Sequence, residues 1–124
     1  MRFQRANFLV SDLDRALILY RDILGMRLDH VQESEDDSYS YDVFEIDKKT
    51  QIKFALLSYS NQPRVMALTE LGKDNLEKMS FPRRSAIVIE VADVDDVLAQ
   101  CKENNFKTYK EEPLVTHDGR EGRE

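Results

Sequence analysis

The sequence predicts an α+β protein of 124 residues, made of one βαβββ module and a shortened second one. Two observations lead to this fold class. The first is an internal repeat at an offset of 81 residues, which places Phe8 on Ile89. The second is a change of period within each copy, from the alternation typical of a strand to the spacing of an amphipathic helix.

The repeat aligns residues 8–17 with residues 89–98, and one Val, two Asp and one Leu are identical between the copies. Most other aligned pairs keep their polarity. Each copy is predicted to form a strand that runs into a helix, so the two copies share a predicted structural unit as well as residue identities. The repeat therefore predicts two related modules in one chain.

In the first copy, residues 3–10 predict a strand whose side chains alternate between two faces. The face expected to pack on a helix contains Ala6, Phe8 and Val10. The opposite face contains Phe3, Arg5, Asn7 and Leu9. This division decides which side chains can reach a site on the far side of the sheet.

A helix is predicted directly after this strand, with Ser11 as its N-cap. Apolar residues at helical spacing predict one buried stripe, formed by Leu13, Ala16, Leu17, Tyr20 and Leu24. Gly25 is placed to end the helix in the left-handed conformation that glycine adopts without steric cost.

The second copy predicts a strand over residues 85–91 and a helix with Asp93 as its N-cap. In the strand, Ala86, Val88 and Glu90 are expected on the face away from the helix. The helix stripe is predicted to contain Val94, Val97, Leu98 and Cys101, so Cys101 is expected in the core rather than as a nucleophile. Asn105 takes the capping place of Gly25.

Three further strands are predicted after the first helix, over residues 26–33, 39–47 and 51–59, with a hairpin turn at 47–50. The domain organisation is then a single domain over residues 1–124. It comprises a first module at 1–59, a linker at 60–84 with a short helix at 69–79, and a second module at 85–124.

Composition excludes several classes of function. The net charge is −6 and no basic stripe is present, so binding to nucleic acid phosphates is not expected. No apolar run approaches the roughly 18 residues of a membrane span. A single cysteine permits no internal disulfide and favours the reducing cytoplasm. Two histidines and one cysteine cannot build a Cys/His zinc cluster.

Residues 8–16 (FLVSDLDRA) and 20–26 (YRDILGM) resemble the strand-to-helix signature of the vicinal oxygen chelate (VOC) superfamily, the glyoxalase, bleomycin-resistance and extradiol-dioxygenase group. Residues 87–95 (IVIEVADVD) resemble the opening of its second module. The resemblance covers most of the chain. It implies paired βαβββ modules that form a curved mixed sheet around a cavity, with the second module incomplete at the C-terminus here.

In enzymes of this family, the resemblance implies a divalent metal in the cavity, held by a first-strand His and an acidic residue from each module. Here Arg5 and Ala86 stand at the histidine positions, and Ala55 stands where the first acidic ligand is expected. The fourth ligand would lie beyond residue 124. We therefore expect no cofactor, and a divalent metal only if ligands lie beyond that residue.

Four residues are candidates for binding a small molecule, namely Arg5, Asn7, Tyr41 and Glu90. The guanidinium of Arg5 suits a carboxylate or phosphate. Arg5 could instead pair with Glu90 on the neighbouring strand, and both arrangements could hold at once. Asn7 faces the same cavity, while Tyr41 could line its mouth or simply pack.

Three functions stay open at this point. The first is a cytoplasmic, bleomycin-resistance-like protein that binds a small organic ligand, anionic or hydrogen-bonding, without metal, and the absence of the usual metal ligands favours it. The second is a metal-dependent lyase or dioxygenase in which His30, His117 or Glu90 supplies atypical ligands. The third is a homodimeric interaction domain that uses an open sheet edge. Whether the chain is an enzyme stays open with them.

Overall fold

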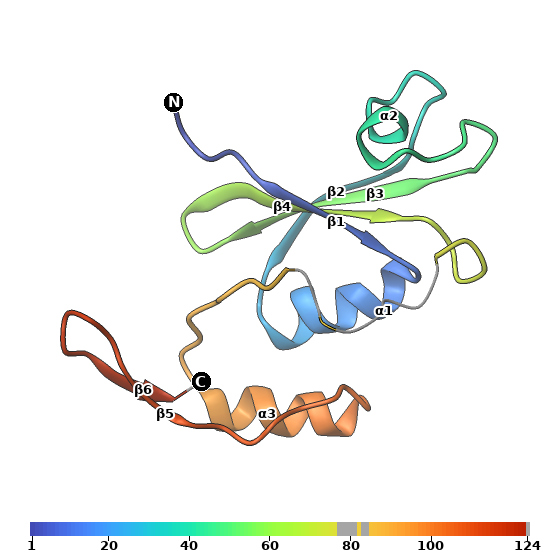
Figure 1. The fold of residues 1–124 in the computed structure, drawn as a ribbon. Helices are drawn as coiled ribbons and strands as arrows, with labels where there is room; N and C mark the ends of the chain where they lie inside the picture. The colour runs from blue at the N-terminus through green and yellow to red at the C-terminus, as the bar shows by residue number, and fades with distance from the viewer. Residues whose placement is uncertain (77–81, 83–84, 124) are drawn as a thin grey trace. The chain divides into compact units, whose positions relative to one another are not determined.

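The computed structural model describes residues 1–76, 82 and 85–123. The chain divides into two compact units, Met1–Ala86 and Ile87–Glu124. Figure 1 shows the secondary-structure elements of both units. Within the described residues, no helix is long and apolar enough to cross a membrane.

The first unit contains a curved, mixed sheet of four strands, in the order β1-β4-β3-β2 (Figure 1). Its strands are β1 (Ala6–Val10), β2 (Arg27–Glu33), β3 (Lys53–Tyr59) and β4 (Gln62–Glu70). β1 pairs with β4 in parallel, and the other neighbours are antiparallel. With the helix between β1 and β2, these strands form a βαβββ module whose last strand is β4, and the α+β fold class is confirmed.

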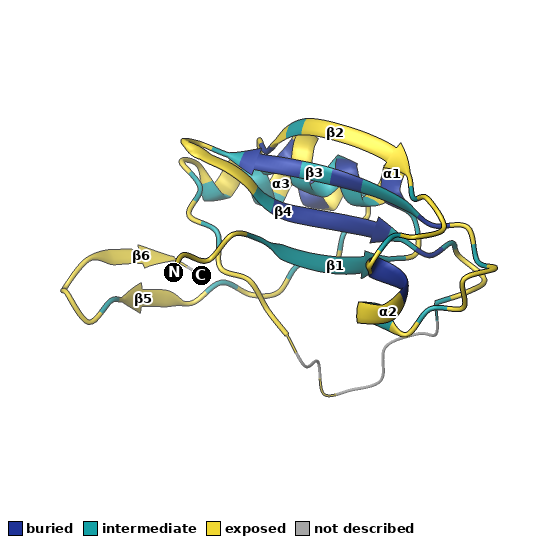
Figure 2. Ribbon diagram, turned by 90° about the horizontal axis from the view of Figure 1, so that it is seen from above, coloured by how far each residue is buried: buried dark blue, intermediate teal, exposed yellow. Residues whose placement is uncertain are grey.

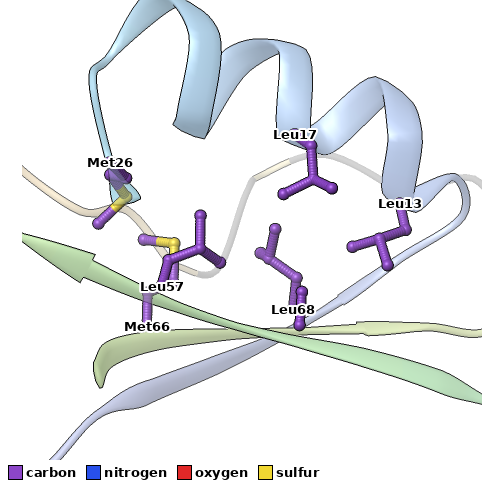
Figure 3. Packing of buried hydrophobic residues seen from close by; sticks show 7 residues of the cluster. Leu13, Leu17, Met26, Leu57, Met66 and Leu68 are labelled. Carbon is purple, nitrogen blue, oxygen red and sulfur yellow. The ribbon is translucent and has the colours of Figure 1, made fainter. Parts of the chain in front are cut away.

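The helical segment between β1 and β2 covers one face of this sheet. It consists of α1 (Leu13–Leu17) and a π-helical continuation, η1 (Ile18–Ile23). Leucines of α1 meet β3 and β4 in the main core, whose buried members are Leu13, Leu17, Met26, Ala55, Leu57, Met66 and Leu68 (Figure 3). Each fully buried leucine contributes about 1.5–3 kcal/mol relative to an exposed one, so this stripe holds the helix on the sheet.

Helix α1 begins one residue later than the sequence predicts, because Asp12 rather than Ser11 is its N-cap. Asp12 has extended backbone angles, and its carboxylate accepts a hydrogen bond from the Arg15 N–H at 3.0 Å. Lys73 also forms an ion pair with Asp12 at 2.8 Å, which lowers the pKa of that carboxyl together with the Arg15 N–H. The internal repeat carried this signal, since it aligns Asp12 with Asp93.

The π-helical turn changes the end of the predicted stripe. Its wider spacing, seen in the hydrogen bond from Leu24 N to Leu19 O at 2.9 Å, places Ile23 in the buried set while Leu24 is only half-buried. The sequence pattern, read at normal helical spacing, predicts Leu24 and omits Ile23. Gly25 ends the helix at φ 71°, so its left-handed conformation is confirmed.

β4 lies where the sequence predicts a linker. Four consecutive residues of this central strand, Met66 to Thr69, are almost completely buried (Figure 2). A central strand covered on both faces has no polar alternation, so its pattern is easily taken for something else. Of the short helix expected at 69–79, Thr69 and Glu70 belong to β4, residues 71–76 are turns or irregular, and residues 77–79 lie outside the described residues.

The strand predicted at 39–47 is wrong, because residues Ser40–Phe44 form the short helix α2. Tyr41 and Ser40 are both buried although they are adjacent, which an alternating strand on one face would not give. Glu45 ends the helix in a left-handed conformation at φ 55°. A helix of five residues is too short to show helical periodicity in the sequence.

The second unit contains helix α3 (Val94–Glu103) and a small hairpin of β5 (Pro113–Val115) and β6 (Glu121–Arg123). Asp93 caps α3 by accepting a hydrogen bond from the Asp96 N–H at 3.0 Å, as predicted. Cys101 is a buried free cysteine, and burial raises the pKa of its thiol, which confirms a core role. Asn105 is left-handed at φ 58°, also as predicted.

The strand predicted at 85–91 is not present, since all seven of these described residues lack regular secondary structure. A strand is stable only when its backbone groups have partners, and no described strand pairs with this segment. Alternation alone therefore predicted the two faces of a strand in a segment that pairs with no described strand. In the first copy the predicted strand is present but begins at Ala6 rather than at residue 3.

Candidate functional site

A pocket of about 940 Å³ lies at one end of the sheet in the first unit. The N-terminal segment, the beginning of β2 and the β3–β4 hairpin form its walls. Figure 1 shows the N-terminal segment and this hairpin at the same end of the sheet. Because side chains from three separated parts of the chain line it, the pocket exists only in the folded unit.

The pocket is strongly cationic. Its described lining includes Arg2, Arg5, Arg27 and Arg64 but only one carboxylate, Asp29. Four guanidiniums against one carboxylate leave a local charge of +3, in a chain whose net charge is −6. Guanidinium groups match carboxylate and phosphate oxygens in both geometry and charge. The pocket therefore has the chemistry of an anion site.

Asp29 organises one side of the pocket. Its Oδ1 accepts a hydrogen bond from Arg27 Nε at 2.9 Å, and its Oδ2 accepts one from the hydroxyl of Ser58. The Ser58 hydrogen bond and then that of Arg27 hold the pKa of Asp29 below its usual value. Ser58 is 0% exposed and also accepts a hydrogen bond from the Arg64 N–H at 2.8 Å. One buried hydroxyl thus ties β2 to the β3–β4 hairpin.

The other arginines are available to a ligand. Among the described residues, the guanidiniums of Arg2, Arg5 and Arg64 form no hydrogen bond or ion pair. Phe8 and Val10 pack against the main core, which confirms the predicted helix-facing side of β1 at these two positions. Arg5 lies just before the strand and lines the pocket.

Asn7 shares the face of Arg5 but lies deeper along β1. Its Oδ1 accepts a hydrogen bond from Thr69 Oγ1 at 3.0 Å, and Thr69 is completely buried. Asn7 is not among the described residues that line the pocket. Its carbonyl oxygen joins β1 to β4, so the structure does not bring Asn7 to the arginines.

Among the four candidate residues, Tyr41 differs most from its expected place at the mouth of a cavity. It lies on α2, is 2% exposed and packs with Ile52 and Leu71 in a second, smaller core. Its hydroxyl donates a hydrogen bond to the Thr50 carbonyl at 3.0 Å. The expectation that it faces a cavity depended on a strand at 39–47, and the helix there turns Tyr41 into a packing residue.

Glu90 belongs to the second unit, where it is exposed in the irregular segment before α3. Its pairing with Arg5 stays a prediction. The two histidines are exposed: His117 lies in the β5–β6 turn, and His30 lies on β2 with its ring centroid 6.0 Å from that of Phe54. The Nε2 of His30 is 2.6 Å from Gln32 Oε1.

The metal site implied by the resemblance does not fit the first unit. Ala55 is completely buried in the helix-side core, so this position faces away from the expected cavity. The last strand of the module is β4 rather than β3, and the β4 residue paired with Asn7 is Ala67. Ala55 was therefore the wrong position for the acidic ligand. Ala67, the β4 residue beside Asn7, has no carboxylate either.

The carboxylate of β4 is engaged elsewhere. Glu70 accepts a hydrogen bond from the Leu13 N–H at the start of α1 and pairs with Lys53 at 3.7 Å. Within the described part of the chain, no group of three or more His, Cys, Asp or Glu side chains could hold a metal ion. The donor set that is present suits anions better than cations.

Sequence reasoning found Arg5 but missed its three partners and Asp29. Arg2, Arg27 and Arg64 are separated along the chain, and nothing in their spacing indicates that they meet. Arg64 was also hidden because the sequence predicts a linker where β4 lies. The usable signal was the strand order: once β4 is recognised as the parallel partner of β1, its beginning must lie beside the segment before β1.

The family model of the Glyoxalase/Bleomycin resistance protein/Dioxygenase superfamily matches residues 2–123. The chain therefore belongs to this superfamily, and the resemblance found in the sequence is confirmed. The fold and the family agree, since a βαβββ module is what the superfamily signature implies.

Two solved structures share the fold. One is a glyoxalase family protein from Bacillus cereus, with 12% identity and a TM-score of 0.65 over 92% of this chain and 75% of that chain. The other is the trypanothione-dependent glyoxalase I of Leishmania major, with 19% identity and a TM-score of 0.58 over 99% of this chain and 84% of that chain. At these identities the likeness shows the fold alone. A comparison with curated proteins found no match.

Proposed function

We propose that this superfamily member binds a small anionic organic molecule at the arginine pocket, without a metal on the sheet face of its first module. One observation supports the proposal above all others: Arg5 stands where the family resemblance implies a metal-binding histidine, and it shares its pocket with three more arginines. A cluster of guanidiniums repels a divalent cation and attracts carboxylate or phosphate groups.

The test of binding is an NMR titration of the protein with acetate, malonate and methyl phosphate, observing backbone amides and arginine Nε–H groups. We expect signals of Arg5, Arg64 and the hairpin to shift in a saturable manner. Arg5→Gln should weaken binding, whereas Arg21→Gln should not. Arg21 does not line the pocket, and its Nε pairs with Asp22 Oδ1 at a distance of 2.6 Å. Equal effects of the two variants would mean that the anions bind through the overall charge of the protein and not at the pocket, and the proposal would be rejected.

The metal-dependent lyase or dioxygenase is the competing function, and elemental analysis separates it from binding alone. Protein purified without chelator should contain substoichiometric zinc, nickel, manganese and iron. Isothermal titration with zinc should show no site in the unmodified protein. The double variant Arg5→His/Ala67→Glu, which introduces a histidine and a carboxylate, is the comparison in which a site could be created. Stoichiometric metal in the unmodified protein would overturn the metal-free part of the proposal.

We also propose that the protein forms a homodimer through an exposed sheet edge. β2 is an edge strand, and six of its seven residues are exposed, including the apolar Val31. Unpaired backbone groups on such an edge can pair with a second copy. Light scattering across a range of protein concentrations tests this, and a monomer mass at every concentration would contradict it.

A further inference from the structure

We infer that the arginine pocket selects a compact dianionic group, a phosphate monoester or a pair of neighbouring carboxylates, over a monoanion. This inference rests on the proposed function and names the ligand chemistry of the same site. It is carried by the way the pocket distributes its own charges among Asp29, Ser58 and the four arginines.

The internal ion pair decides how much charge is left for a ligand. Asp29 accepts hydrogen bonds from Arg27 and Ser58 and also interacts electrostatically with Arg64, so its single negative charge offsets one of the four positive charges. A net charge of +3 remains in the pocket, and the guanidiniums of Arg2, Arg5 and Arg64 form no ion pair among the described residues. A monoanion would leave two of these like charges facing each other, whereas a dianion leaves one. The second negative charge of a dianion therefore removes repulsion between guanidiniums that a monoanion would leave in place.

The backbone at Arg64 is a second, independent observation. Arg64 has φ 52°, a left-handed conformation that a side chain with a Cβ rarely adopts. Its N–H is held by the completely buried hydroxyl of Ser58, which fixes this conformation. Strained residues of this kind persist where the surroundings determine them and gather at ligand sites. Arg64 lines the same pocket as Arg5.

In this arrangement Asp29 limits the affinity for dianions, because it reduces the positive charge of the pocket without contacting the ligand. This gives a prediction opposite to that of a binding carboxylate. Asp29→Asn keeps the shape and the hydrogen-bonding capacity toward Ser58, but it releases the charge of Arg27. The variant should bind dianions more tightly than the unmodified protein, because the local charge rises from +3 to +4.

The experiment is isothermal titration of the full chain with acetate, malonate and methyl phosphate at about pH 8, where a phosphate monoester carries its second charge, and at low ionic strength. We expect malonate and methyl phosphate to bind about five- to tenfold more tightly than acetate, which corresponds to one additional charge interaction. Arg64→Gln and Arg5→Gln should each reduce this preference. Arg21→Gln is the matched control and should preserve it. Comparison of malonate with methyl phosphate tells whether the natural group is a dicarboxylate or a phosphate ester.

The outcomes separate this inference from the proposed function. Saturable binding of all three anions with equal affinity would leave the anion site standing and overturn the dianion preference. Weaker binding of dianions by Asp29→Asn would mean that Asp29 contacts the ligand, which also overturns the charge argument. No saturable binding of any anion would reject both the site and the preference.

Discussion

The two copies of the strand–helix repeat share their helix signals and differ in their strands. In both copies an Asp side chain accepts a hydrogen bond from the N–H three residues on, at 3.0 Å. Both helical segments are followed by a left-handed residue, Gly25 or Asn105. Only the first copy has a strand before the helix, because β1 pairs with β4 while residues 85–91 pair with no described strand.

This difference teaches that the two kinds of element depend on different distances along the chain. A helix satisfies its backbone within four residues, so its caps work wherever they occur. A strand must instead find hydrogen-bonding partners in another segment of the chain. The consequence shows in exposure: Leu68 on β4 is 0% exposed, whereas Val88 in the second copy is 84% exposed.

The largest effect is expected from a change in the core of the first unit. Leu68→Ala should lower the free energy of unfolding by about 2–5 kcal/mol, because it leaves a cavity between α1 and β4. Val88→Ala, at the exposed position of the second copy, should change it by less than about 0.5 kcal/mol. Urea denaturation followed by circular dichroism measures both. Similar losses for the two variants would show that residue 88 is buried and that the contrast between the copies is wrong.

A smaller effect should come from the two capping aspartates, and here the copies should behave alike. Asp12→Ala and Asp93→Ala should each destabilise their helix by about 1 kcal/mol. Asp12→Ala should be the more costly of the two, because Lys73 also pairs with that carboxylate at 2.8 Å. Amide hydrogen exchange in α1 and α3 reports each helix separately. Unchanged protection in either helix would mean that its cap is not the signal that starts it.

The pH dependence sharpens the same comparison. Lys73, and then the Arg15 N–H, lowers the pKa of Asp12 in the folded protein. The stabilisation is therefore fully present above the unfolded value of about 4 and is lost as the pH falls through the lower folded value. The protein should lose α1 protection in this acidic range more steeply than Asp12→Asn, which has no carboxyl to titrate. Parallel pH profiles of the two proteins would exclude this linkage.

The smallest effects should come from exchanging the left-handed caps. Gly25→Asn and Asn105→Gly should each change the free energy of unfolding by less than about 1 kcal/mol, because both residue types tolerate a positive φ. Gly25→Ala provides the contrast and should be worse than Gly25→Asn. Thermal unfolding of the three variants tests the order, and an Ala variant as stable as the Asn variant would contradict a left-handed residue 25.

Part of the candidate site was predictable and part was not. Arg5 was predictable, since alternation in the first strand decides which side chains face away from the helix. Tyr41 was not, because a five-residue helix and a short strand give similar patterns. Arg64 was hidden within a segment whose proline suggests a linker, although Pro63 lies near the beginning of β4, where the hairpin tolerates it.

The sequence by itself determined features that depend on near neighbours: the Asp93 cap, the left-handed residues Gly25 and Asn105, the buried Cys101 and the family signature. Only the tertiary structure decided which strands have partners, that Met66 to Thr69 lie at the centre of the sheet, and that arginines from three separated segments share one pocket. The physical reason is range. Capping and periodicity act over three or four residues, whereas strand pairing and charge clustering arise only when segments far apart in the chain are brought together.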